Sequence, residues 1–394
     1  MDDLDAQAVE SWLLSFVRAD VPRGEAARRT AAALFRALGD PQDRVRAVHV
    51  VGTAGKGTAA RLVADTLRRR GDTVGLHLSP HVHDIRERFT VGDDLPDWAL
   101  VADAAAEVRG AIERIEQQPT FFAVTAAMAS VLAHRAETDW LVVEAGIGGR
   151  VDATNTFHRV DVVTMVTAIG LDHCDVLGDT VEEIAAEKLA VVTGRRVAVL
   201  GPQPSDAVVA VARNRAAAEG VRLVEVMPEH DWKRDAEATA TAAVAELVPD
   251  APPVRFVEQA GRFERKVEGS ITWIFDGAHN PMKLRALASS LVDQPRPRVG
   301  VVAIGAGKVL DECVPAIAPA LDRVVAVTFG RGAGPQGHAA DAVAAAFERV
   351  GVAARPARDP ASAALAATAN DPATVVVTGS FLHLSAIRGA VGGR

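Results

Sequence analysis

The stretch Val48-His49-Val50-Val51-Gly52-Thr53-Ala54-Gly55-Lys56-Gly57-Thr58 determines how the rest of the chain is interpreted. Its β-branched start predicts a strand, its glycines predict a turn, and residues 59–67 have the apolar spacing of a helix. In such a turn, backbone N–H groups and the helix N-terminus face phosphates, and Lys56 adds a full positive charge. We therefore predict a phosphate-binding loop. Its spacing differs from the usual Walker A motif, because Gly57 separates Lys56 from Thr58.

Length and composition restrict the class of protein. A chain of 394 residues that is 49% apolar suits two globular domains. We expect no membrane span, since no apolar run approaches about 20 residues, and no nucleic-acid partner, since the net charge is −8. The acidic N-terminus does not resemble a secretory signal, and two cysteines make neither a disulfide framework nor a metal cluster. We therefore expect a cytoplasmic location.

The first part of the chain alternates between strand and helix patterns from residue 48 to about residue 225. This alternation predicts a mostly parallel sheet, with ligands at the carboxyl ends of its strands. A helical region is expected before it, at residues 4–37. Further strands are expected at 73–78, 139–144, 162–168 and 197–200, and helices at 97–115 and 180–188, the latter with a capping-box start at Thr180.

A second alternation follows a proline-rich break at residues 249–262, which we interpret as the linker. Strands are expected at 271–275, 299–304, 324–327 and 374–378, and helices at 281–292, 311–321, 338–350 and 354–369. The predicted fold class is α/β, with a mostly parallel P-loop ATPase domain at residues 1–258, including the N-terminal helical segment. A smaller Rossmann-like α/β domain is expected at residues 259–394.

Three polar residues follow strand ends in the first domain, as the glycine loop does: Ser79, Glu144 and His173. Because the carboxyl ends of parallel strands share one edge, we expect these groups to meet there. An acid after the strand beside a phosphate loop is a suitable Mg²⁺ partner. Taken singly, Glu144 also fits a solvated loop acid, His173 a structural histidine and Ser79 a turn residue. The joint arrangement favours a site for a nucleotide–magnesium complex.

The chain resembles the folylpolyglutamate synthase/dihydrofolate synthase family, within the Mur ligase superfamily. The resemblance extends in order over nearly the whole chain and is therefore more specific than a glycine loop alone. The matching stretches are Leu38 to Gln42, Gly52 to Thr58, Ser79-Pro80-His81, Glu87-Arg88, Thr120-Phe121-Phe122, Glu144 to Asn155, Ile169 to His173, Glu187-Lys188, Asp276 to Pro281 and Val377 to Ser380.

The resemblance implies a role for each matching residue. It places the ATP phosphates on Gly52, Thr53, Gly55, Lys56, Gly57 and Thr58, with Arg262, Asp276 and His279 also contacting the nucleotide. It implies Mg²⁺, as two ions, bound by Thr58, Ser79, Glu144, His173 and a carbamylated Lys188. Catalytic roles are implied for Lys56, Lys188 and His173, and the acceptor acid is expected at Arg88, Phe121, Phe122 and Asp152.

The reaction implied by the resemblance is ATP-dependent amide formation by a monomer. A substrate carboxylate attacks the γ-phosphoryl group, and an amino acid, glutamate in the family, then attacks the acyl phosphate. Plain readings remain open for two residues: Lys188 also fits a helix-surface lysine, and Arg262 a linker charge.

Departures from the family pattern leave the identity of the acid substrate undecided. Ala54 replaces an expected Asn, Ala123 an expected Glu and Asp235 an expected Asn, and residues 200–230 look shorter than in the family. Two alternatives to the folate reaction therefore remain. One is a related ligase for a non-folate acid in specialised metabolism, and the other is a non-catalytic nucleotide-binding protein. Retention of the metal-binding set argues against the second.

Overall fold

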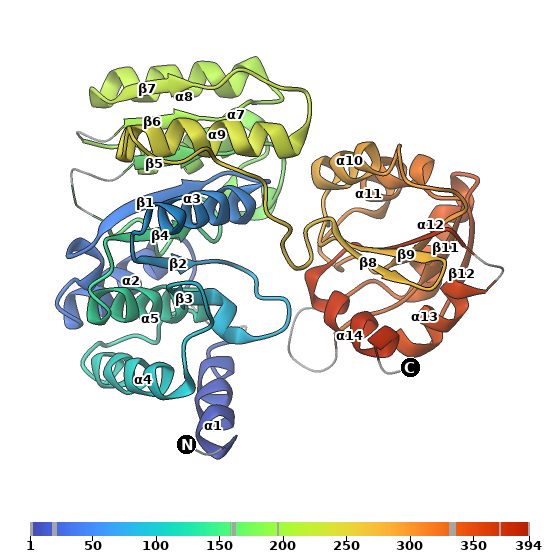
Figure 1. The fold of residues 1–394 in the computed structure, drawn as a ribbon, viewed down its shortest axis with the longest axis horizontal. Helices are drawn as coiled ribbons and strands as arrows, with labels where there is room; N and C mark the ends of the chain where they lie inside the picture. The colour runs from blue at the N-terminus through green and yellow to red at the C-terminus, as the bar shows by residue number, and fades with distance from the viewer. Residues whose placement is uncertain are drawn as a thin grey trace. The chain divides into compact units, whose positions relative to one another are not determined.

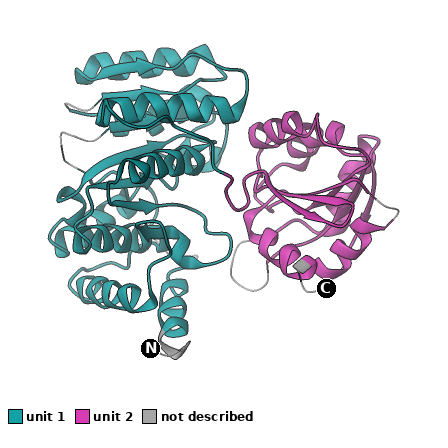
Figure 2. Ribbon diagram, in the orientation of Figure 1, with its two compact units in different colours: residues 1–257 teal, residues 258–394 magenta. Residues whose placement is uncertain are grey.

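The computed structural model describes residues 3–17, 22–157, 159, 163–194, 197–330, 336–369 and 372–392. The chain divides into two compact units, residues 1–257 and 258–394 (Figure 2). Two predicted elements extend into residues outside the described ranges: residues 18–21 of the expected N-terminal helical region and residue 162 of an expected strand. None of the helices in the described ranges is long and apolar enough to cross a membrane.

Unit 1 is built on a seven-stranded sheet with the order β3-β2-β4-β1-β5-β6-β7 (Figure 1). All neighbouring strands are parallel except β2 and β3. The strands are β1 Arg46–Val51, β2 Val74–His77, β3 Phe89–Val91, β4 Trp140–Glu144, β5 Val163–Val166, β6 Val197–Leu200 and β7 Arg222–Glu225.

Helices cover both faces of this sheet. Those of unit 1 are α1 Asp3–Leu14, α2 Gly24–Ala37, α3 Lys56–Arg70, α4 Trp98–Ile112, α5 Phe121–Arg135, α6 Cys174–Leu177, α7 Val181–Lys188, α8 Asp206–Glu219 and α9 Trp232–Leu247, with short 3-10 helices η1 Pro41–Asp43, η2 Ile85–Arg88 and η3 Leu189–Val191. The expected capping box is present at the start of α7, where Thr180 and Glu183 exchange hydrogen bonds.

The central strand β1 illustrates why this sheet is buried on both faces. Val48 and Val50 pack against α3 in one apolar cluster, whereas Ala47 packs with Val143 and Phe157 in another. Side chains alternate along a strand, so an uninterrupted apolar run supplies both faces at once. Each fully buried Val or Leu side chain contributes roughly 1.5–3 kcal/mol to folding.

Unit 2 contains a six-stranded sheet with the order β12-β11-β10-β13-β9-β8, in which only the β8–β9 pair is antiparallel. Its strands are β8 Glu264–Glu268, β9 Ile271–Phe275, β10 Arg298–Val302, β11 Arg323–Ala326, β12 Ala353–Pro356 and β13 Thr374–Thr378. Its helices are α10 Pro281–Ser290, α11 Leu310–Ile317, α12 Ala340–Arg349, α13 Pro360–Thr368 and α14 Phe381–Gly392, with the 3-10 helix η4 Ala318–Ala320.

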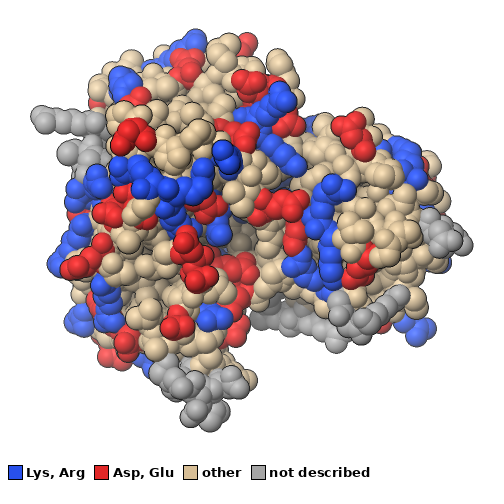
Figure 3. All heavy atoms as spheres, viewed as in Figure 1, with Lys and Arg blue, Asp and Glu red and all other residues tan. Residues whose placement is uncertain are grey.

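The fold class expected from the sequence, two mostly parallel α/β sheets, is confirmed. The expected helical region at 4–37 contains two helices, since α1 ends at Leu14 and α2 begins at Gly24. One local expectation was wrong. The expected helix at 354–369 begins as the edge strand β12, since β11 offers an open edge with which residues 353–356 pair. Figure 3 shows acidic and basic side chains interspersed over the visible face of each unit.

Candidate active site

The glycine loop lies between β1, which ends at Val51, and α3, which begins at Lys56. Gly52 has φ +148°, and a Cβ atom there would lie 2.1 Å from the hydroxyl oxygen of Thr167. Gly55 has φ +85° and caps α3. Both positions therefore require glycine, which takes such conformations at no steric cost. The first N–H groups of a helix have no partner within it, so the start of α3 has the chemistry to receive an anion.

Thr53 fastens this loop to the segment that follows β5. Its backbone N–H donates to the carbonyl of Ala168 (2.8 Å). Its hydroxyl donates to the carbonyl of Gly170 (3.0 Å) and accepts from the Gly170 N–H (3.2 Å). The sequence pattern placed Thr53 at the phosphates, but this bracing role was missed because the partner is more than one hundred residues away.

Three of the predicted site residues are close together in unit 1. The ammonium of Lys56 lies 4.0 Å from Oε1 of Glu144, and Oε2 of Glu144 accepts a hydrogen bond from the backbone N–H of Ser79 (2.8 Å). Lys56 begins α3 after β1, Glu144 ends β4 and Ser79 follows β2. These three strands are neighbours in the sheet. Glu144 is buried, so Lys56 offsets a carboxylate that has lost most of its water.

Thr58 and His173, two other expected metal ligands, lie in the first turn of α3 and at the start of α6. Thr58 is buried in the first turn of α3. His173 caps the short helix α6 with φ +52°, and its ring lies 4.0 Å from the carboxylate of Asp172. No three His, Cys, Asp or Glu side chains in the described ranges gather as a metal site. Mg²⁺ on a nucleotide needs only one or two carboxylates besides phosphates and waters, so Glu144 beside the glycine loop suits it chemically.

Arg88 and Phe121, two of the residues expected at the acceptor acid, lie together. The Arg88 guanidinium stands 4.8 Å from the centre of the Phe121 ring, and its Nε donates to Nδ1 of His81 (2.8 Å). Arg88 is buried, and burial lowers the pKa of its guanidinium to about 10, against the opposing effect of Glu144. A buried cation beside an aromatic ring is suited to an anionic, planar ligand.

Two histidines not proposed as site residues adjoin this cation. The His77 ring lies 5.2 Å from that of Phe122. Burial, and then the charge of Arg88, lower the pKa of His77 to about 3 and that of His81 to about 4. Both imidazoles are therefore neutral at pH 7. His77 and His81 flank the predicted site residue Ser79, and this proximity in sequence was the signal that could have identified them.

The loop after β4, residues 146–154, is organised by Asp152. One carboxylate oxygen accepts from the Ile147 N–H (2.9 Å), and the other accepts from the N–H and the hydroxyl of Thr154 (2.9 and 2.6 Å). Burial raises the pKa of Asp152, while these hydrogen bonds oppose the rise. Asp152 was expected at the acceptor acid; here its carboxylate holds its own loop.

Lys188 ends α7 beside the same loop. Its side chain is buried, which excludes the plain reading as a helix-surface lysine. Glu187 connects α7 to the loop, because its carbonyl accepts from the Arg150 N–H (3.0 Å) and its carboxylate from the Val151 N–H (3.1 Å). A Cβ atom on Gly149 would lie 2.3 Å from the Lys188 carbonyl oxygen, so the loop packs directly on the end of α7.

In unit 2, Asp276 is at the end of β9. Its carboxylate accepts from the N–H groups of Ala278 and Phe263, each at 2.8 Å. Burial raises the pKa of this carboxyl to about 6, with hydrogen bonds and Arg262 acting in the opposite direction.

Arg262 and His279 share an aromatic neighbour in unit 2. The Arg262 guanidinium is 5.3 Å from the centre of the Phe381 ring, and the ring of His279 is 6.4 Å from it. Lys283 lies 3.2 Å from Nε2 of His279. Two cations and an imidazole are therefore gathered around one aromatic ring in unit 2.

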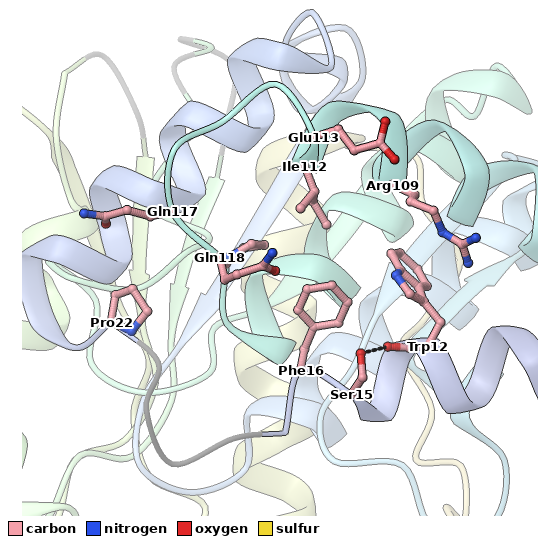
Figure 4. Close-up of a pocket in the computed structure, with 10 residues that line it drawn as sticks. Trp12, Ser15, Phe16, Pro22, Arg109, Ile112, Glu113, Gln117 and Gln118 are labelled. Carbon is pink, nitrogen blue, oxygen red and sulfur yellow. Dashed lines mark hydrogen bonds between the residues drawn. The ribbon is translucent and has the colours of Figure 1, made fainter.

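A cavity of about 580 Å³ lies among α1, α4 and the segment before α5. Figure 4 shows Trp12 and Arg109 side by side on it, and the guanidinium stands 5.1 Å from the Trp12 ring. The cavity is lined by Trp12, Ser15, Phe16, Pro22, Arg109, Ile112, Glu113, Gln117, Gln118 and Pro119. The sequence pattern did not indicate it, because its walls come from helices without a shared motif.

Comparison with known proteins supplies the context for this geometry. Residues 261–381 match the family described as "Mur ligase, glutamate ligase domain". The chain is 40% identical over 185 residues to a folylpolyglutamate synthase of Lacticaseibacillus casei, a match that covers 45% of the chain and 42% of that protein. In four such matches the chain spans less than half of the curated relative's length.

Solved structures match over almost the entire chain. The folylpolyglutamate synthase of Mycobacterium tuberculosis, complexed with ADP, has a TM-score of 0.87 and 26% identity, with 99% of each chain covered. A bifunctional folylpolyglutamate synthase/dihydrofolate synthase with Mn, AMPPNP and L-glutamate bound has a TM-score of 0.84 and 25% identity, with 98% of each chain covered.

Proposed function

This chain belongs to the folylpolyglutamate synthase/dihydrofolate synthase family of the Mur ligase superfamily, and we propose that it couples a carboxylic acid to glutamate at the expense of ATP. The preferred acid is a folate or a dihydropteroate. The observation that carries the proposal is the meeting of Lys56, Glu144 and Ser79 beside the glycine loop. A positive charge, a helix N-terminus and a magnesium-binding carboxylate are the groups that a triphosphate needs.

The reaction has two steps. In the first, a carboxylate oxygen of the acid forms a bond to the γ-phosphorus while the bond to the leaving ADP breaks. In the second, the amine nitrogen of glutamate forms a bond to the acyl carbon, phosphate leaves with the electron pair of the C–O bond, and the nitrogen loses a proton. Bound magnesium would neutralise part of the phosphate charge in the first step.

The residues of unit 1 have distinct parts in this proposal. Lys56 and the start of α3 hold the phosphates and stabilise the charge that builds up on them. Thr58, Ser79, Glu144 and His173 are the proposed oxygen and nitrogen ligands of magnesium. Arg88 holds the acid through its charge, on the surface that includes Phe121.

Arg262, Asp276 and His279 are the proposed nucleotide contacts of unit 2. The guanidinium and the imidazole, both beside Phe381, offer a cation and a hydrogen-bonding ring. The Asp276 carboxylate keeps their loop in shape through the N–H groups of Ala278 and Phe263.

Carbamylation of Lys188 is a finer part of the proposal. The burial of Lys188 favours carbamylation, because a carbamate replaces a buried ammonium with an anionic oxygen ligand. An amine must be neutral to react with CO₂, and burial in general favours the neutral form of a lysine. The modified group would then stand as a ligand for a second magnesium ion.

A second candidate function is ligation of a non-folate acid, and Ala123 favours it. This residue is fully buried in a cluster with Ala31 and Ala153, against which Phe122 packs. The family pattern has Glu at this position, which would offer a carboxylate to a ligand. The buried alanine lacks that carboxylate, which suits an acid without a hydrogen-bond donor at this point.

The test is ADP release by the full chain with dihydropteroate or tetrahydrofolate, each with glutamate. The folate reading expects release that depends on both the pterin and glutamate, together with a product heavier by one glutamyl residue. Release with another carboxylic acid, and none with either pterin, would support the second candidate. A chain that binds ATP but releases no ADP with any acid would contradict both.

A further inference from the structure

A buried chain of hydrogen bonds connects the central strand of unit 1 to the loop of residues 146–154. His49 lies in β1 and is 1% exposed. Its Nε2 is 2.7 Å from the hydroxyl oxygen of Thr154, and that hydroxyl is 2.6 Å from Oδ1 of Asp152. The other oxygen of Asp152 accepts from the Ile147 N–H. No predicted site role had been given to His49 or Thr154.

The direction of each hydrogen bond follows from the number of protons. The hydroxyl of Thr154 donates its single proton to Oδ1 of Asp152, which also accepts from the Thr154 N–H. The hydroxyl oxygen must then accept from His49, which therefore carries its proton on Nε2. The three groups form a continuous series of donors that ends on the carboxylate.

This series of hydrogen bonds connects the strand before the glycine loop to the loop of residues 146–154. His49 is three residues before Gly52 and therefore moves with the strand that carries the glycine loop. At the other end, the loop stands against the acceptor side, since a Cβ atom on Gly146 would lie 2.9 Å from the Phe122 ring. Asp152, with its two oxygens on Ile147 and Thr154, is the point through which the strand holds the loop.

We propose that His49 is a positioning residue that, through Thr154, orients the Asp152 carboxylate and with it the loop against which the acceptor acid binds. The effect on the acid rests on the proposed function. The effect on the loop does not, because it concerns hydrogen bonds within this chain. A buried donor or acceptor that loses its hydrogen-bond partner is costly in free energy. Removal of one side chain in the series therefore weakens the next hydrogen bond along it.

The experiment compares His49→Leu and Thr154→Val with His49→Gln, whose amide donates near the position of the imidazole Nε2–H. Thr164→Val is the matched control. Thr164 is the β5 residue beside His49 in the sheet, equally buried, and its hydroxyl has no hydrogen-bond partner within the part of the chain that the structure describes. The control therefore disturbs the same layer of the sheet without touching the series.

The first readout is hydrogen exchange at the Ile147 and Thr154 amides, both of which donate to Asp152. We expect about tenfold faster exchange in His49→Leu and Thr154→Val, with wild-type exchange in the control and recovery in His49→Gln. The second readout is kinetic: the KM for the acid rises about tenfold while the KM for ATP changes less than about twofold.

Each outcome decides the inference. Unchanged exchange in both His49→Leu and Thr154→Val would overturn it. Equal increases in both KM values with a lower Tm would also overturn it, because that is the signature of general destabilisation. Should wild-type protein turn over no pterin acid, the proposed function fails, whereas the exchange measurement still decides whether His49 positions the loop.

Discussion

Each unit has an acidic side chain at the carboxyl end of a parallel strand, and the two acids are used differently. Glu144 in unit 1 faces the ammonium of Lys56 and accepts one N–H, that of Ser79, so its charge is balanced by another side chain. Asp276 in unit 2 accepts two N–H groups of its own surroundings, from Ala278 and Phe263. The same topological position thus supports a charge pair in one unit and a structural anchor in the other.

The two strand ends differ in the groups that surround the acid. In unit 1 the strand β1 is followed by a loop with glycines at positive φ and a full α3 helix, which supply N–H groups and a cation. In unit 2 the Asp276 carboxylate after β9 accepts hydrogen bonds from nearby backbone N–H groups. Arg262 and His279, both beside Phe381, are the polar side chains left to contact a ligand. Variants at both edges test whether the two strand ends differ in this way.

Lys56→Ala is expected to have the largest effect. It removes the cation that we propose holds the phosphates and leaves the buried Glu144 carboxylate without its partner. We expect kcat/KM for ATP to fall by about 10²–10³-fold or more, as for other lost charge stabilisers. Lys266→Ala, which breaks an ion pair with Glu268 in unit 2, is the control and should keep activity. ADP release with varied ATP measures both, and retained activity in Lys56→Ala would contradict the phosphate role.

Lys188→Ala is expected to reduce kcat by about 10²-fold, because a proposed ligand of the second magnesium ion is lost. Added short carboxylates should restore part of the activity, since they can supply the missing oxygen. Mass spectrometry of native protein in bicarbonate buffer tests directly for the carbamate on Lys188. Full activity of the variant would refute the carbamate proposal, whereas loss without rescue would leave Lys188 a structural lysine.

The strands that the sequence revealed differ physically from those it concealed. The central strands, such as β1 and β4, are mostly apolar and are buried on both faces, with His49 in β1 and Glu144 at the end of β4 as buried polar residues. The four strands not singled out, β3, β7, β8 and β12, all lie at the edges of the two sheets. An edge strand such as β8, with the sequence ERKVE, is partly exposed and charged, so it lacks an apolar run.

The site could be predicted in part for a similar reason. Lys56, Glu144 and Ser79 follow neighbouring strands, and the ends of parallel strands share an edge whatever their exact register. The bonds from Thr53 to Gly170 and from His49 to Thr154 depend on register and loop conformation. A residue pattern contains neither, and so these contacts became visible only in three dimensions.

Asp276 predicts a pH dependence of stability for unit 2. Its pKa is raised by burial from 3.8 to about 6, so between these values the folded state binds more protons than the unfolded state. Stability therefore falls as pH rises from about 4 to about 6, by roughly 2–3 kcal/mol, and stays lower above it. Asp276→Asn should remove this slope. Urea unfolding from pH 4 to 8 measures it, followed by fluorescence in a full chain whose other four tryptophans, Trp12, Trp98, Trp140 and Trp232, are replaced by Phe so that Trp273 in β9 is the reporter. An unchanged slope on Asp276→Asn would contradict the assignment.

The smallest expected effects come from two threonines that tie strand ends together. Thr53 exchanges hydrogen bonds with Gly170 at the glycine loop, and Thr378 donates to the carbonyl of Ala278 in unit 2. Thr53→Val should raise the KM for ATP by about tenfold, because the phosphate loop loses its brace, while Thr53→Ser should not.

Thr378→Val should lower the free energy of unfolding by about 1 kcal/mol, the typical net contribution of one hydrogen bond, and should therefore lower the Tm. It should change the KM for ATP by less than about threefold. The pair of variants isolates the contrast between the two sheet edges, since each removes one hydroxyl from one strand end. An equal rise in the KM for ATP in both would mean that the edge of unit 2 positions the nucleotide as strictly as the glycine loop does.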